Sequence, residues 1–378
     1  MFQSVRHPSE KDISGCAISG IMSESGRRFS GERIIRSIAN MHDRSNGLGG
    51  GFAGYGIYPE HPDRYALHVM YETSSGKRSA EAVMCERCDV HAEEPIPTRA
   101  LDQVRNRPIL HRYFLTVKQD YLGQHYDLTP DDVIVELVMK INSSADGAFV
   151  FSSGRNMGIF KGVGFPEQIG EFFRIEEYDA YIWTAHGRFP TNTTGWWGGA
   201  HPFGLLDWSV VHNGEISSYG RNRRYLMNFG YHCTLQTDTE VITYLFDLLV
   251  RKHRLPLDAA CMALAPPFWS QIERMPPEEQ ELARTLRIVY GGALLNGPFS
   301  VLVASTGGMI GFNDRIKLRP MCAARKDDMF YIASEEAAIR AVCDDPDELR
   351  HARGGLPIVA KVKEPSGEPP VRVPLSAG

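Results

Sequence analysis

The chain of 378 residues lacks an apolar run long enough to cross a membrane, and its first residues lack the apolar segment of a secretory signal. It also lacks an excess of positive charge, because its formal net charge is -5 and its pI is about 6.2. Nucleic acids and anionic membranes bind concentrated positive charge, so neither is expected as a partner. We therefore expect a cytoplasmic protein.

Cysteine is scarce, and metal or cofactor motifs are missing. The seven cysteines are scattered and odd in number, which is typical of reduced thiols in a protein without a signal peptide. Cys85 and Cys88 with His91 supply only part of a four-ligand zinc set, so no metal site is expected. Residues 154–164 lack the glycine spacing of a dinucleotide loop. Since no flavin, nicotinamide or iron–sulfur motif occurs either, we expect no cofactor on this chain.

Helix and strand patterns occur in blocks along the sequence. Helical spacing or capping residues predict helices over 29–43 (with Ser30 as N-cap), 128–142 (capped by Thr129), 237–253 and 276–292. Strands are predicted at 147–154, 177–189 and 208–216, a hairpin at 297–314 with its turn at Gly307–Gly308, and a strand followed by a helix at 327–342. This order predicts an α+β protein of packed antiparallel sheets with helices outside.

Four short motifs carry the polar chemistry. They are "CAISG" (16–20), "RFPT" (188–191), "HNGE" (212–215) and "TDTE" (237–240). Each alone has an ordinary structural explanation: a buried cysteine, a turn, a hairpin and a helix cap. Their occurrence together, in this order, favours a common site.

The four motifs resemble the pattern of class II glutamine amidotransferases, which are N-terminal-nucleophile hydrolases. The segments 297–303, 315–321 and 331–339 also resemble later core segments of that family. Within the family, "GRFPTNT" (187–193), "AHPF" (200–203) and "GRNRRYL" (220–226) are most similar to the glutaminase part of glutamate synthase. The resemblance implies an αββα sandwich of two antiparallel sheets with outer helices.

The resemblance also implies a nucleophile, Cys16, and a processed chain. A thiolate suits amide hydrolysis through a covalent intermediate, and the α-amine of a first-residue cysteine has a pKa near 8 and serves as base. Because fifteen residues precede Cys16, we expect cleavage after Gly15. The expected organisation is a leader (1–15), one amidotransferase domain (16–362) with a partly helical insertion at 72–145, and a proline-rich tail (363–378).

The remaining site residues combine the resemblance with the chemistry of a zwitterionic amide. The resemblance implies that Asn213 and Gly214 donate to the oxyanion of the tetrahedral intermediate. Arg188 would hold the α-carboxylate of glutamine, and Asp238 its α-ammonium. The other expected substrate-binding residues are Thr191, Asn192 and, with a structural role equally open, Arg44.

These expectations define a function and its alternatives. The chain is expected to hydrolyse L-glutamine and to deliver ammonia to a partner synthase, of the kind that carries flavin in a split glutamate synthase. One alternative is a hydrolase of the same fold that cuts another amide, and a second is an uncleaved scaffold or regulatory subunit. The Asn-Gly pair argues against the scaffold, because a scaffold needs no oxyanion hole.

Overall fold

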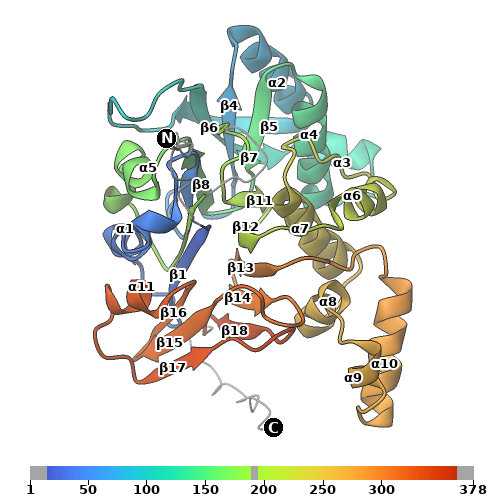
Figure 1. Cartoon of the computed structure of the whole chain (residues 1–378). Coiled ribbons are helices and arrows are strands. Elements are labelled where there is room, and N and C mark those ends of the chain that lie inside the picture. Colours follow the sequence, from blue (N-terminus) through green and yellow to red (C-terminus); the bar gives the residue numbers. More distant parts are fainter. Residues whose placement is uncertain (1–14, 189–194, 364–378) are drawn as a thin grey trace, which may run out of the picture.

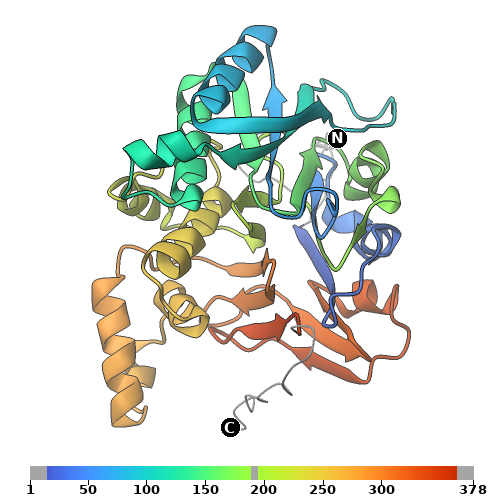
Figure 2. The same ribbon diagram turned by 180° about the vertical axis from the view of Figure 1, so that it is seen from behind.

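A computed structural model describes residues 15–188 and 195–363 of the protein. Two antiparallel sheets face each other at its centre, with helices outside them (Figures 1 and 2). Within the described ranges, no helix combines the length and the apolar character that crossing a membrane requires.

The first sheet has seven strands in the order β17-β15-β16-β1-β10-β3-β8, and all neighbouring pairs are antiparallel. Its strands are β1 (Ala17–Ser23), β3 (Gly50–Tyr55), β8 (Met157–Gly162), β10 (Ile182–Gly187), β15 (Cys322–Lys326), β16 (Met329–Ala333) and β17 (Glu348–His351). Strand β1 is buried along its whole length between β10 and β16. Cys16, which directly precedes β1, is therefore attached to a strand that its neighbours hold in place.

The second sheet has five antiparallel strands in the order β11-β12-β13-β14-β18. They are β11 (Phe203–Leu205), β12 (Trp208–Gly214), β13 (Phe299–Ser305), β14 (Gly308–Asn313) and β18 (Ile358–Lys361). Strands β12 and β13 contact β1 and β10 of the first sheet. The two sheets thus pack through the strands that carry the predicted motifs.

Helices cover the outer faces of both sheets. Helices α1 and α5 pack against strands of the first sheet together with α11, and α7 packs against β11 and β12 of the second. The helices of these layers are α1 (Glu32–Ala39), α5 (Pro166–Phe172), α6 (Tyr219–Met227), α7 (Asp238–Phe246), its π-helical continuation (Asp247–Lys252), α8 (Leu257–Leu264), α9 (Trp269–Ile272), α10 (Pro277–Val289) and α11 (Glu336–Arg340). The predicted αββα sandwich is confirmed.

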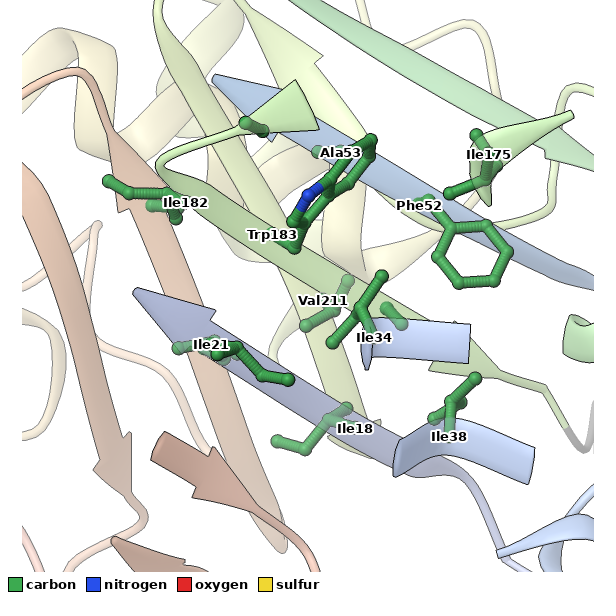
Figure 3. Close-up of a cluster of buried hydrophobic side chains, with 14 of the residues drawn as sticks. Ile18, Ile21, Ile34, Ile38, Phe52, Ala53, Ile175, Ile182, Trp183 and Val211 are labelled. Carbon is green, nitrogen blue, oxygen red and sulfur yellow. The ribbon is translucent and has the colours of Figure 1, made fainter. Parts of the chain in front are cut away.

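One apolar core connects the helix layer with both sheets. Figure 3 shows Ile18 and Ile21 of β1 in a cluster with Ile34 and Ile38 of α1 and Val211 of β12, all of them buried. Burial of each such side chain stabilises the fold by roughly 1.5–3 kcal/mol relative to exposure. The core therefore holds β1 from the helix layer and from the second sheet.

A third sheet lies beside this sandwich and includes much of the segment 72–145. It has four strands in the order β5-β6-β4-β7: β4 (Tyr65–Tyr71), β5 (Cys88–Pro95), β6 (Ile109–Val117) and β7 (Ala148–Ser152). Helices α2 (Ser74–Arg87) and α4 (Pro130–Ser144) cover it, and α3 (Gln119–Gln124) follows β6. The sequence predicts the helical part of this segment but not β5 and β6, because their alternation is obscured by charged residues on an exposed face.

Two local predictions need correction by a residue or more. Helix α1 begins at Glu32 after the N-cap Gly31, whereas Ser30 lies in the short strand β2 (Phe29–Ser30), which pairs with β9 (Asp179–Ala180). A Cβ on residue 31 would lie 2.2 Å from the carbonyl oxygen of Ile175, so only glycine fits there.

The turn of the predicted hairpin is also shifted. Ser305 pairs with Gly308, which places the two-residue turn at Thr306–Gly307. Gly308 is a strand residue with φ of +152°, and its missing Cβ makes room for the carbonyl oxygen of Ala360 in β18. By contrast, the Thr129 cap of α4 is confirmed, since Thr129 and Asp132 form a reciprocal capping box.

Candidate active site

Two neighbouring strands of the first sheet bring Cys16 and Arg188 together. Ala17 in β1 pairs with Gly187 in β10, so the residues that flank these two meet at one edge of the sheet. Burial lowers the pKa of Arg188, and the charges of Cys16 and Asp238 oppose that shift. The guanidinium therefore lies within electrostatic reach of both the thiol and the carboxylate, although Cys16 and Asp238 are 222 positions apart in the sequence.

The Asn213–Gly214 pair ends strand β12 of the second sheet. Asn213 is buried, and its Nδ2 donates to Ser334 Oγ at 3.4 Å. The same Oγ accepts from the backbone N–H of Ile18 at 3.2 Å. Ser334 thus joins the predicted oxyanion donor to the strand that carries Cys16.

Gly214 has a backbone that no other residue would adopt without strain. Its φ is +151°, and a Cβ there would lie 2.0 Å from the carbonyl oxygen of Pro298. The neighbouring Glu215 donates its N–H to that same carbonyl at 3.0 Å. The Asn-Gly motif is therefore a tight strand end packed against the start of β13, and not a two-residue hairpin turn.

Arg44 contacts the main chain of the nucleophile. Its Nε donates to the carbonyl oxygen of Cys16 at 3.1 Å, and its Nη1 donates to Glu335 Oε1 at 2.6 Å. These contacts give Arg44 a structural role beside Cys16. Contact with substrate, the other role expected for it, stays a prediction.

Asp238 is held in its ionised form at the start of α7. Thr237 caps the helix, and Asp238 Oδ2 accepts from the N–H of Ile216 at 2.9 Å. Burial alone raises the pKa of Asp238, but His212, the Ile216 N–H and the Thr239 hydroxyl outweigh it and lower the pKa below its ordinary value. A partly buried anion of this kind suits an ammonium ligand.

Three buried histidines surround these residues, and sequence reasoning assigned them no role. His186 Nε2 donates to the carbonyl oxygen of His212 at 2.9 Å, and the His186 and His201 rings stack at 4.0 Å. Thr239 Oγ1 lies 2.6 Å from His201 Nε2 and 3.2 Å from His212 Nδ1. Burial lowers the pKa of His186 to about 3, so this imidazole is neutral at pH 7.

The histidines have a signal in the sequence. His212 directly precedes Asn213, His186 stands two residues before Arg188, and His201 lies in the segment "AHPF". His201 and His212 therefore belong to quoted motifs and His186 directly precedes one, although periodicity alone gives a buried histidine no function. Thr191 and Asn192, two of the expected substrate-binding residues, lie outside the described residues.

A surface cavity of 840 Å³ lies beside this constellation but does not contain it. Asn46, Arg105, Arg107 and Gly195 are among the residues that line it. Of the predicted site residues that the structure describes, neither Cys16 nor Arg188, Asn213 or Asp238 lines it. The geometry of the motif residues, and not this cavity, therefore defines the candidate site.

No group of three or more His, Cys, Asp or Glu side chains in residues 15–188 and 195–363 is arranged to hold a metal ion. Cys88 is buried in the core under the third sheet, whereas Cys85 is exposed. His91 Nε2 instead contacts Thr116 Oγ1 at 2.7 Å. The Cys85–Cys88 pair with His91 thus has a structural explanation in the described part of the chain.

Comparisons with known proteins indicate the family of this chain. The model of class II glutamine amidotransferases matches residues 98–232, a range that includes Arg188, Asn213 and Gly214. A protein of Methanothermobacter thermautotrophicus, provisionally named a glutamine amidotransferase, is 26% identical over 87% of this chain and 94% of its own length. The chain belongs to the class II glutamine amidotransferase family.

Other relatives place this amidotransferase chain among proteins of very different length. An uncharacterized protein of Archaeoglobus fulgidus is 50% identical over 94% of both chains. The large chain of a Bacillus subtilis glutamate synthase that uses NADPH is 25% identical over 59% of this chain, which corresponds to 16% of that protein. Sequences similar to this chain thus make up most of one relative and a small part of another.

Proposed function

We propose that this chain is a glutaminase that hydrolyses L-glutamine to glutamate and transfers the ammonia to a partner synthase. The observation that supports this most is the pairing of Ala17 with Gly187, which brings Cys16 and Arg188 to one edge of the first sheet, with the Asp238 carboxylate within electrostatic reach of Arg188. A cation and a partly buried anion near one thiol match the α-carboxylate, the α-ammonium and the reactive amide of glutamine.

The proposed reaction begins with Cys16. Its Sγ attacks the side-chain amide carbon of glutamine, and the negative charge that develops on the amide oxygen is stabilised by Asn213 Nδ2 and the Gly214 N–H. Collapse of this intermediate breaks the C–N bond and releases ammonia, which takes the proton that left the thiol. Water then attacks the thioester, and glutamate leaves as Cys16 regains its thiol.

The proton needs a carrier between these steps, and the α-amine of Cys16 is the proposed one. An α-amine with a pKa near 8 takes up and returns a proton close to neutral pH. It is available only when the peptide bond between Gly15 and Cys16 has been cut. The proposal therefore includes removal of the segment before Cys16.

The proposed acceptor is a flavin-dependent synthase on another chain, as in a split glutamate synthase. The resemblance of the motifs and the likeness to the Bacillus subtilis glutamate synthase large chain support this choice. Free ammonia is protonated in water, so transfer to the acceptor requires a shielded route between the two proteins.

A glutaminase assay with two cysteine variants tests the proposal. Cys16→Ala is expected to lower ammonia release from L-glutamine by a factor on the order of 10⁴ or more, because the nucleophile is lost. The matched control is Cys85→Ala, which removes an exposed thiol from α2 and should leave the rate unchanged. Retained activity in folded Cys16→Ala would overturn the proposed mechanism.

A further inference from the structure

Lys161 in β8 is a buried basic residue that the proposed reaction does not use, and burial lowers its pKa to about 7. Its side chain has no exposed surface, although lysine is among the residues least often buried. It lies opposite Gly51 of β3, where a Cβ would come within 2.8 Å of the Lys161 side chain. A buried ammonium group costs several kcal/mol unless it is hydrogen-bonded, so its partners indicate its role.

The Lys161 ammonium group is directed at the backbone that follows the 189–194 segment. Its Nζ donates to the carbonyl oxygen of Gly198 at 3.0 Å and lies 4.1 Å from the centroid of the Phe203 ring. Glu240 attracts it through the interior, while the Glu240 oxygens accept from the N–H groups of Thr234 and Leu235. The direct hydrogen bond of Lys161 is thus to a backbone carbonyl.

The next carbonyl along the chain is used by Arg188. Arg188 Nη1 donates to the carbonyl oxygen of Gly199, one residue after the acceptor of Lys161. Gly199 also donates its N–H to the carbonyl oxygen of Trp196 at 3.1 Å, which closes a turn. A Cβ on Gly199 would lie 3.1 Å from Arg188 Nη1, so turn and guanidinium are in close contact. Two basic side chains, Lys161 and Arg188, therefore donate to adjacent carbonyls of one turn, Trp196–Gly199.

We propose that Lys161 is a positioning residue for glutamine recognition: it fixes the Trp196–Gly199 turn, whose Gly199 carbonyl orients the guanidinium of Arg188. This inference rests on the proposed function, in which Arg188 binds the α-carboxylate. Lys161 itself touches neither the substrate nor Cys16 in this account. Its effect is on substrate binding, and the thiol chemistry proceeds without it.

The test compares Lys161→Met with Ile159→Val, a matched control that alters the packing of the same buried strand two residues away. In Lys161→Met, the KM for glutamine should rise about tenfold while kcat changes by less than about twofold. The rate at which iodoacetamide alkylates Cys16, followed on the peptide that contains it, should stay that of wild type because this reagent has no α-carboxylate. Ile159→Val should change neither constant.

A double variant shows whether Lys161 acts through Arg188. If it does, adding Lys161→Met to Arg188→Ala should raise KM no further, because the coupled interaction is already lost. A KM in Lys161→Met equal to that of wild type would overturn the proposal, and so would a full additional increase in the Arg188→Ala background. Loss of alkylation, kcat and melting temperature together would also overturn it, since that pattern indicates a purely structural lysine.

Lys161→Gln provides the second variant if the methionine chain does not fold. Its amide retains a donor for the Gly198 carbonyl, so its KM should lie between those of wild type and Lys161→Met. If neither variant folds, the role is structural and the proposal fails. A wild-type protein without glutamine turnover would overturn both this proposal and the proposed function, whereas normal turnover with unchanged variants overturns this one alone.

Discussion

The two sheets contribute the candidate site in different ways. At the end of the seven-stranded sheet, the main chain of Cys16 accepts from Arg44, which pairs with Glu335, and these two side chains are 23% and 43% exposed. At the end of the five-stranded sheet, Asn213 is buried and bonded to Ser334, and the buried Thr239 of the adjoining α7 contacts His201 and His212. The first half is supported by solvent-screened contacts, and the second by buried polar contacts that are costly to leave unpaired.

This difference predicts that substitutions in the two halves affect activity and stability to different extents. Substitutions around Cys16 should change turnover with little effect on folding, because exposed ion pairs contribute only about 0–1 kcal/mol. Substitutions in the buried network should change both, because each leaves a polar group without a partner.

Apart from loss of the nucleophile itself, the largest effect is expected at the oxyanion donor of the buried half. Asn213→Ala should lower kcat for glutamine by about 10²–10³-fold, which corresponds to roughly 2.7–4 kcal/mol in the barrier. KM should change little, since the donor acts mainly on the developing negative charge. Steady-state kinetics of ammonia release measure both constants. A folded Asn213→Ala protein with the wild-type kcat would remove Asn213 from the mechanism.

A smaller effect is expected at Thr239, which contacts the buried histidines. Thr239→Val removes the hydroxyl that His201 and His212 share, at nearly constant volume. Stability should fall by about 1–3 kcal/mol because a buried imidazole nitrogen loses its partner. Urea unfolding measures this loss, and KM should rise as well because His212 supports Asp238. Unchanged stability would show that the histidine network does not stabilise this half of the site.

The smallest effect is expected at the exposed pair. Glu335→Gln should lower stability by less than about 1 kcal/mol, because its ion pair with Arg44 is partly solvated. Its kcat should fall by a few-fold, since Arg44 positions the carbonyl of Cys16. Parallel unfolding and kinetic measurements compare it with Thr239→Val. If Glu335→Gln were the more destabilising of the two, the contrast between the halves would be wrong.

The sequence predicts the fold where local signals are strong. The Thr129 cap, the strands that carry the motifs and the approach of Arg188 to Cys16 all follow from residue patterns or from the resemblance. The strands β5 and β6 escape prediction because charged residues on an exposed face obscure their pattern, and only their pairing with each other and with β4 shows them to be strands.

The supporting residues of the site are equally non-local. Ser334 meets Ile18 across 316 residues, which no spacing rule anticipates. A lysine in a strand is normally expected at the protein surface, yet the fold buries Lys161 against the Gly198 carbonyl. Chemistry-bearing motifs are therefore readable in the sequence, whereas the residues that hold them in place become visible only when the sheets are packed.

The most direct test of the central claim is labelling with 6-diazo-5-oxo-L-norleucine, a glutamine analogue that alkylates a nucleophile able to attack the side-chain position. Mass analysis of the mature protein should find one adduct, on the thiol of Cys16, in a peptide that begins at Cys16 with a free α-amine. Glutaminase activity should fall in proportion to labelling. An adduct on exposed Cys85 in place of Cys16, or an active protein in which Gly15 is still joined to Cys16, would contradict the account.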